Sequence, residues 1–459
     1  MNSSLPVLAP IHRSSLTIHH FFSYFDNSLA ILVRLTLCVG CLSWAMCLTA
    51  QEGTGTSSES EPVSSDVVRD WVAKLDSNSF RDRETATRKL PTLGRAAIGP
   101  TLDFAKTANR EAGWRCIEVL RAICFREDRT ARNEADAALE ILAARKDPLG
   151  ERAIIVLRDE RTTRVRDASS KISALGGTIT YQASPERDSY QVRLGETWQG
   201  TDRDLMPLVD LPNVTWLSME RSPIGNDGLA QIQELTRLEK LYLGQSKVTG
   251  EGLRYIRKLE NISNLSLRGL KVANSDLENL SKLDKLETLG LDDTQISDAG
   301  LVHLGKLPKL QFLWLNRTKV TDQGLEALQP CQSLTKLYLS GTKVGGPGLA
   351  KLKILPKLNY LSLQGVTLSD ADLVHLSEVT QLETLGLDDT QLTDAGLEPL
   401  KNLKQLKVLW VSNTALTDDG LSKLDGLPAL KRIYAKGTHL TPTAIREFEE
   451  KHPDCKIDQ

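Results

Sequence analysis

Leucine recurs through the second half of the chain with a fixed period. The first leucine of each unit follows the previous one by 24 residues without an insertion, and cysteine or valine replaces it in two units. These positions are Leu211, Leu235, Leu259, Leu283, Leu307, Cys331, Leu355, Val379, Leu403 and Leu427. A fixed period of about 20–50 residues is typical of repeat architectures. We therefore predict ten stacked units over residues 211–440.

Each unit has the pattern LxxLxxLxLxxTxhTDxGLxxL, where h is aliphatic, and residues 283–306 read LDKLETLGLDDTQISDAGLVHLGK. Leu289 and Leu291 alternate with other residues, which predicts a short strand with both leucines in the core. The leucines of the second half recur at helical spacing, so a brief helix follows. A Ser or Thr before an Asp is a typical helix cap. The predicted caps are Ser297, Thr321, Thr393 and Thr417.

These units resemble leucine-rich repeats. The TDxGLxxL half is similar to the short-helix class found in F-box-type adaptors and in exported repeat proteins of planctomycete bacteria, over residues 211–450. The resemblance implies an α/β solenoid with a curved parallel sheet inside and short helices outside. Neither element can bury its apolar side alone, so neighbouring units must stack.

The units themselves repeat in groups of four. The residue between the last two strand leucines runs Tyr242, Ser266, Gly290, Trp314, and then Tyr338, Ser362, Gly386, Trp410. Residues 286–301 and 382–397 are accordingly almost identical. We interpret residues 235–330 and 331–426 as two copies of one duplicated block.

The remaining sequence predicts four further segments. Residues 1–50 end in an apolar run with small residues before Gln51, as in a signal peptide, and an uncleaved anchor over residues 29–50 is the alternative. The Ser- and Gly-rich residues 51–65 indicate a disordered linker. Residues 176–210 alternate as a strand pair that caps the repeats, and residues 441–459 form the C-terminal cap.

Residues 66–175 show helical periodicity and form the predicted all-α domain. Val67, Val68 and Leu75 belong to the apolar side of its first helix. Residues 79–106 resemble a HEAT-type helical pair, which implies a HEAT-like domain. Its arginines are interleaved with acids, and the whole chain carries a net charge of -2, so we expect no nucleic-acid partner.

Candidate catalytic groups are few. Asp292 and Asp293 recur as Asp388 and Asp389, but four strand spacings of about 4.8 Å are too far for a cooperating carboxylate pair. Motifs for phosphate binding, serine hydrolysis or zinc proteolysis are missing, and the cysteine spacing indicates neither a metal site nor a disulfide framework. We therefore expect no enzyme activity, no cofactor and no bound metal.

Aromatic residues concentrate at strand positions that point away from the predicted core, onto the concave face. They are Trp216, Tyr242, Phe312, Trp314, Tyr338, Tyr360, Trp410 and Tyr434. Exposed aromatics of this kind are typical anchors for a protein or peptide, although duplication without selection would also place them there. The leading hypothesis is an exported, monomeric, non-enzymatic scaffold, touching a membrane only through an uncleaved anchor. The alternatives are an intracellular substrate adaptor of ubiquitin-ligase type and a cell-wall carbohydrate-binding protein.

Overall fold

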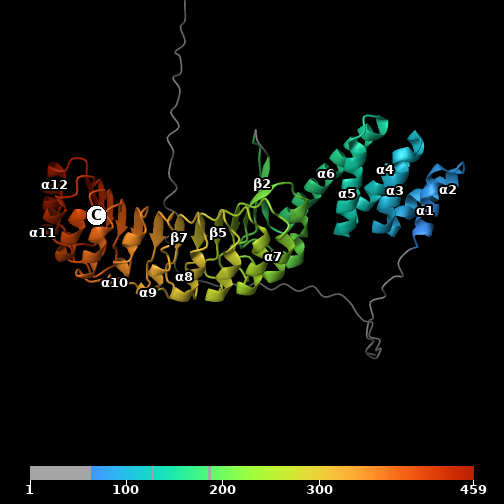
Figure 1. Cartoon of the computed structure of the whole chain (residues 1–459). Helices are drawn as coiled ribbons and strands as arrows, with labels where there is room; N and C mark the ends of the chain where they lie inside the picture. The colour runs from blue at the N-terminus through green and yellow to red at the C-terminus, as the bar shows by residue number, and fades with distance from the viewer. Residues whose placement is uncertain (1–63, 127, 185–187) are drawn as a thin grey trace, which may run out of the picture. The chain divides into compact units, whose positions relative to one another are not determined.

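The computed structural model describes residues 64–459, except for residue 127 and residues 185–187. The predicted export segment and almost all of the predicted linker lie outside the described residues. The described chain begins with helices and continues as a long sheet backed by short helices (Figure 1). Within these residues, no helix combines the length and the apolar character needed to cross a membrane.

The first region is all helical, as predicted. Its helices are α1 (Ser65–Ala73), α2 (Phe80–Lys89), α3 (Arg95–Thr107), α4 (Arg110–Cys124), α5 (Arg129–Ala143) and α6 (Pro148–Ala174), with 3₁₀ turns η1 (Lys74–Asp76) and η2 (Leu90–Leu93). Val68, Val72 and Leu75 join its core. Val67 lies outside this core and is 47% exposed, because the core side of α1 follows Val68 and Val72. The likeness to HEAT repeats stays a prediction.

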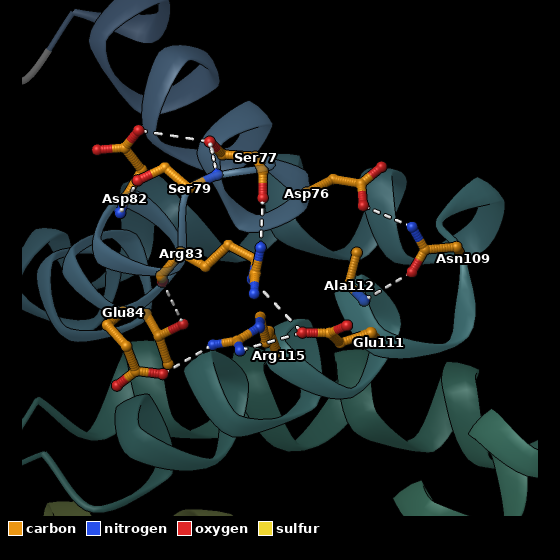
Figure 2. Close-up of polar contacts among 11 residues, drawn as sticks. Asp76, Ser77, Ser79, Asp82, Arg83, Glu84, Asn109, Glu111, Ala112 and Arg115 are labelled. Carbon is orange, nitrogen blue, oxygen red and sulfur yellow. Dashed lines mark hydrogen bonds and ion pairs between the residues drawn. The ribbon is translucent and has the colours of Figure 1, made fainter.

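Arginine side chains tie the first helices of this region together. Figure 2 shows Arg115 of α4 donating to Glu84 of α2 at 2.9 Å and to Glu111 of its own helix at 3.2 Å. Arg83 donates to the Ser77 carbonyl at 2.7 Å. These two arginines are therefore occupied by partners within the helical region.

The sheet contains thirteen strands in chain order. The strands are β1 (Thr178–Gln182), β2 (Ser189–Arg193), β3 (Val214–Ser218), β4 (Lys240–Tyr242), β5 (Asn264–Ser266), β6 (Thr288–Gly290), β7 (Phe312–Trp314), β8 (Lys336–Tyr338), β9 (Tyr360–Ser362), β10 (Thr384–Gly386), β11 (Val408–Trp410), β12 (Arg432–Tyr434) and β13 (Lys456–Asp458). β1 pairs antiparallel with β2, and β2 to β13 are parallel. The predicted leucine-rich repeat fold is confirmed.

Short helices line the side opposite the strands (Figure 1). Half of these elements are 3₁₀ turns rather than α-helices, because each unit has room for one or two turns only. They are η3 (Asp202–Asp210), α7 (Asn226–Ile232), η4 (Gly250–Lys258), η5 (Asn274–Leu280), α8 (Asp298–Leu304), α9 (Asp322–Glu326), α10 (Gly346–Leu349), η6 (Leu352–Ile354), η7 (Asp372–Glu378), η8 (Asp394–Asn402), α11 (Asp418–Leu421), η9 (Ser422–Leu424) and α12 (Pro442–Lys451).

The interior of each unit follows the predicted pattern. Leu286, Leu289 and Leu291 are fully buried. Where a unit has Thr after the strand, this Thr is a structural residue: the hydroxyl of Thr294 donates to the carbonyl of Leu291 at 2.6 Å, which closes the turn. Equivalent bonds recur at Thr318, Thr342, Thr390 and Thr414.

The turn after each strand from β3 to β12 has one residue with positive φ, between 53° and 74°. These residues are Arg221, Gln245, Gly269, Asp293, Arg317, Gly341, Gly365, Asp389, Asn413 and Gly437. Each non-glycine residue there is strained by about 1–2 kcal/mol. The geometry lets the N–H of Asp293, for example, donate to the Asn316 carbonyl at 2.9 Å, so pairing with the next unit continues past the strand end. Asp292 and Asp293 therefore lie in the turn that follows β6.

Aspartate or asparagine at the start of the short helices forms a ladder from unit to unit. Asp298 accepts from the backbone N–H of Thr321 at 2.8 Å and from its hydroxyl at 2.7 Å. The same bonds join Asp394 to Thr417. The predicted capping role holds only in part: Thr321 and Thr393 accept from their own helix, whereas Ser297 and Thr417 do not.

The ladder is interrupted at two places that lie four units apart. At each place the same two substitutions occur together. Gly250 stands where the ladder needs Asp, and the next unit has Asp276 where other units have Gly. Asp276 accepts the Ala273 N–H at 2.8 Å, and a Cβ on Gly250 would lie 1.6 Å from its carboxylate. Gly346 and Asp372 repeat this exchange. The two substitutions therefore compensate each other.

Candidate binding surface on the open face of the sheet

The middle residue of each three-residue strand from β4 to β12 is buried, as is Leu217 of β3, and its two neighbours along the strand point to the other side of the sheet. We call the surface made by these neighbours the open face. All eight predicted aromatic residues lie on it, each half-buried: Trp216, Tyr242, Phe312, Trp314, Tyr338, Tyr360, Trp410 and Tyr434. Their location on the open face follows from the alternation that the sequence showed.

Four of these residues form one cluster, which we call the central aromatic cluster: Phe312, Trp314, Tyr338 and Tyr360. The ring centroids of Trp314 and Tyr338 are 5.1 Å apart with an interplanar angle of 10°, and those of Tyr338 and Tyr360 are 4.8 Å apart. Lys336 lies between two of the rings, with its ammonium 5.0 Å from Phe312 and 5.8 Å from Tyr360. The cluster therefore combines a flat apolar surface with a cation.

Burial raises the pKa of the Tyr338 and Tyr360 phenols above the ordinary value. Both hydroxyls consequently remain neutral across the physiological range. They can donate or accept a hydrogen bond at the edge of the central aromatic cluster.

The other aromatics form two pairs. Trp410 stacks on Tyr434 with ring centroids 3.8 Å apart and an interplanar angle of 18°. Trp216 and Tyr242 are tilted by 47° at 5.7 Å, and the Arg193 guanidinium lies 5.7 Å from the Trp216 ring. The predicted site is thus three separate aromatic groups along the sheet rather than one continuous strip.

Glycines between the aromatic groups are not open gaps. Gly290 pairs with Trp314 and Gly386 pairs with Trp410 in the sheet register. Both glycines are buried. Both positions are therefore closed to solvent although glycine has no side chain.

The duplicated carboxylates have structural partners. Asp292 accepts the Asn316 N–H at 2.9 Å, and Asp388 accepts the Ser412 N–H at 2.7 Å. Burial raises the pKa of both carboxyls. These roles within the turns do not resemble a catalytic acid–base pair, and among the described residues no group of three or more His, Cys, Asp or Glu could hold a metal ion.

A polar cavity of about 510 Å³ adjoins the first aromatic pair. Amide, hydroxyl and charged side chains dominate its lining, and Trp216 contributes an aromatic wall. The lining includes Gln182, Ser189, Gln191, Asn213, Thr215, Arg237, Glu239, Lys240 and Asn261. Sequence reasoning missed this cavity because the strand pair at its edge lies outside the repeat pattern.

Sequence reasoning also missed the charge environment of the aromatic groups. The position of Lys336 between two rings becomes visible only through the strand register, which aligns it with Phe312 on one side and Tyr360 on the other. Comparing residues that are 96 positions apart would have shown that Gln364 and Asn413 in the second copy replace Arg268 and Arg317 of the first.

The fold and this periodic surface define a leucine-rich repeat solenoid with an aromatic open face. Residues 210–398 match the family described as leucine-rich repeat region, so the chain contains a leucine-rich repeat region. The subclass of F-box-type repeats and a planctomycete origin remain predictions. No curated protein matches the chain.

Several solved structures are similar to this chain. An internalin (InlF) from Listeria monocytogenes is 18% identical, over 64% of this chain and 94% of that chain, with a TM-score of 0.41. A complex of TLR13 with ssRNA13 is 20% identical over 54% of this chain and 39% of that chain, with a TM-score of 0.40. A TDR receptor is 18% identical over 55% and 44% of the two chains, with a TM-score of 0.38.

Proposed function

We propose that this protein is an exported, non-enzymatic scaffold that holds a protein or peptide on the open face of its sheet. The observation that carries the proposal is the grouping of eight half-buried aromatic side chains on that face. Binding energy at protein interfaces concentrates on a few aromatic anchors, with tryptophan and tyrosine foremost.

The arrangement of these rings suits a partner surface rather than a small substrate. The central aromatic cluster extends over β7, β8 and β9, and Trp410–Tyr434 continues on β11 and β12. Anchors spread along a sheet bind an extended or flat partner, whereas small molecules bind in enclosed cavities.

Export and a second interaction surface complete the proposal. The signal-peptide pattern of residues 1–50 supports secretion to the periplasm or the exterior, with an anchor over residues 29–50 as the alternative. The helical region offers the second surface, where Phe80 is 66% exposed and Phe125 is 52% exposed.

The test is affinity capture from the exported fraction with the full chain as bait. The Trp314→Ala/Trp410→Ala variant is the comparison, with its fold verified by circular dichroism. The matched control is Trp114→Ala, which removes a 39% exposed tryptophan from α4 in the helical region. We expect proteins identified by mass spectrometry to be retained by the parent and by Trp114→Ala, and to be lost from the double variant. Equal capture by all three baits would refute binding on the open face.

Carbohydrate binding is a second candidate, favoured by the polar cavity beside Trp216. Hydroxyl and amide groups around one aromatic ring suit a sugar, which needs hydrogen bonds and a stacking surface. A pull-down with insoluble wall polysaccharide would distinguish this candidate. Retention of the full chain, together with its loss in Trp216→Ala, would favour it over protein binding.

A further inference from the structure

The duplicated blocks place the same aromatic pair at two places on the open face. Trp314–Tyr338 and Trp410–Tyr434 occupy equivalent positions 96 residues apart, and both pairs are stacked. If the two places had the same role, the charged groups beside them would be equivalent too. Instead, the negatively charged and the positively charged groups both differ between the two places.

The turn carboxylate of the first copy is neutralised. Asp293 forms ion pairs with Arg268 at 3.1 Å and with Arg317 at 2.5 Å. Both guanidinium groups also act on the adjacent Asp292, where their charge opposes the rise in pKa that burial causes. Two arginines thus balance two aspartates in this copy.

In the second copy the same positions lack cations. Gln364 and Asn413 replace the arginines, and their amides donate to Asp389 at 2.9 and 2.8 Å. Among the described residues, no Lys, Arg or His forms an ion pair with Asp388 or Asp389. Burial raises the pKa of Asp388, and the like charge of the adjacent Asp389 adds to this rise. The second copy therefore presents two carboxylates without counter-charge.

The cation at the first position of the strand also differs between the two places, but here the first place has the unpaired charge. Lys336, near the start of the second block, lies between Phe312 and Tyr360, and no carboxylate among the described residues pairs with it. Its equivalent, Arg432, forms an ion pair with Asp458 at 3.2 Å. Of these two residues, Lys336 in the central aromatic cluster is therefore the one that keeps a free positive charge.

Two further lysines do not remove this difference. Lys407 lies on the second copy but is paired with Glu383 at 2.8 Å. Lys436 is two strands away from Asp388 in the same row, roughly 10 Å at the backbone, where exposed charges are largely screened.

We propose that the open face from β8 to β11 is a polarised docking surface for an extended protein segment, with an acidic side chain of the segment at Lys336 and a basic one at Asp388 and Asp389. This inference rests on the proposed function and adds the charge and the direction of the partner. Complementary charges at the edge of aromatic anchors fix the orientation of a partner and exclude partners of the wrong pattern.

The geometry also sets the spacing within the partner. Lys336 pairs with Tyr360 and Tyr360 with Thr384, and Asp388 follows Thr384 by four residues. Two strand spacings across the sheet, and four residues along the chain that run past the end of β10, separate the two charge sites by at most about 16 Å at the backbone. An extended segment covers this distance in about five residues.

The experiment is a selection of random twelve-residue peptides, displayed on phage, against the full chain. We expect enriched peptides to have an acidic and a basic residue about five positions apart, with an aromatic or aliphatic residue between them. The consensus peptide is then synthesised with a fluorescent label, and its affinity is measured by anisotropy. Lys336→Gln and Gln364→Arg/Asn413→Arg should each weaken binding roughly two- to fivefold, as expected for exposed ion pairs. The arginine pair copies residues that the first block already accommodates.

The controls separate this inference from the proposed function. Lys353→Gln removes an exposed cation on the helix side, in η6, and should leave the affinity unchanged. A peptide with its acidic and basic residues exchanged should bind the parent more weakly. If peptides are enriched and depend on Trp314 and Trp410 but show no charge pattern and no response to the charge variants, the polarised surface is refuted and open-face binding stands. If no peptide is enriched over the Trp314→Ala/Trp410→Ala variant, both fail.

Discussion

The side chains that hold neighbouring units together are short and polar, although leucine dominates the sequence. Asp394 accepts two hydrogen bonds from Thr417 of the next unit. The equivalent Asp or Asn residues of most other units bond to the next unit in the same way. These bonds satisfy backbone N–H groups at the starts of the short helices, which would otherwise lack partners. An aspartate at the start of one short helix therefore forms its hydrogen bonds mainly with the next unit.

Asp394→Ala should reduce the free energy of unfolding by about 1–3 kcal/mol, because the Thr417 N–H and hydroxyl lose their acceptor in a half-buried position. The control is Asp419→Ala, an exposed aspartate in the next unit whose carboxylate makes no hydrogen bond within the described residues. Urea unfolding followed by circular dichroism measures both. Equal effects of the two substitutions would show that the ladder contributes nothing.

At the scale of elements, the strands and the buried leucines could be predicted because their signal is the periodicity itself. The open-face location of Trp314 followed from the same alternation. The positive-φ turns could not be predicted, since Arg317, Asp389 and Asn413 occupy positions where glycine is the usual signal. The hydrogen-bond partners of Asp293 and Asp389 could not be predicted either, because they are side chains of the preceding and the following unit.

The exchange between Gly250 and Asp276 makes a prediction about coupled elements. Gly250→Ala should destabilise the chain, because the new Cβ would collide with the Asp276 carboxylate at 1.6 Å. The double variant Gly250→Asp/Asp276→Gly restores the arrangement of the other units and should regain most of the loss shown by Gly250→Asp alone. A double-mutant cycle from thermal melts measures this coupling. Additive effects of the two substitutions would contradict the compensation.

At the scale of the whole molecule, the repeat region is a linear array. The strand order follows the chain from β1 to β13, so each unit pairs only with the units before and after it in sequence. Stability in such an array is approximately the sum of unit and interface contributions. No unit depends on a distant one for its place in the sheet.

Deleting residues 331–426 should therefore leave a folded chain. The cut removes four whole units and joins residue 330 to residue 427, which keeps the period of 24. We expect cooperative thermal unfolding, at a Tm below that of the parent because fewer interfaces remain. A deletion of residues 331–414 removes three and a half units. This variant should show no cooperative unfolding transition, since strand and helix positions no longer align across the junction. Two indistinguishable melting curves would contradict this account.

The duplicated blocks also bear on how this gene can change. Residues 286–301 and 382–397 are nearly identical and lie one whole block apart, so unequal recombination between their coding sequences would add or remove 96 residues in frame. Because the sheet runs in chain order, every product would still be a complete array. Each such event would therefore change the number of aromatic groups by those of one block. The length of partner that the protein can hold would change with it.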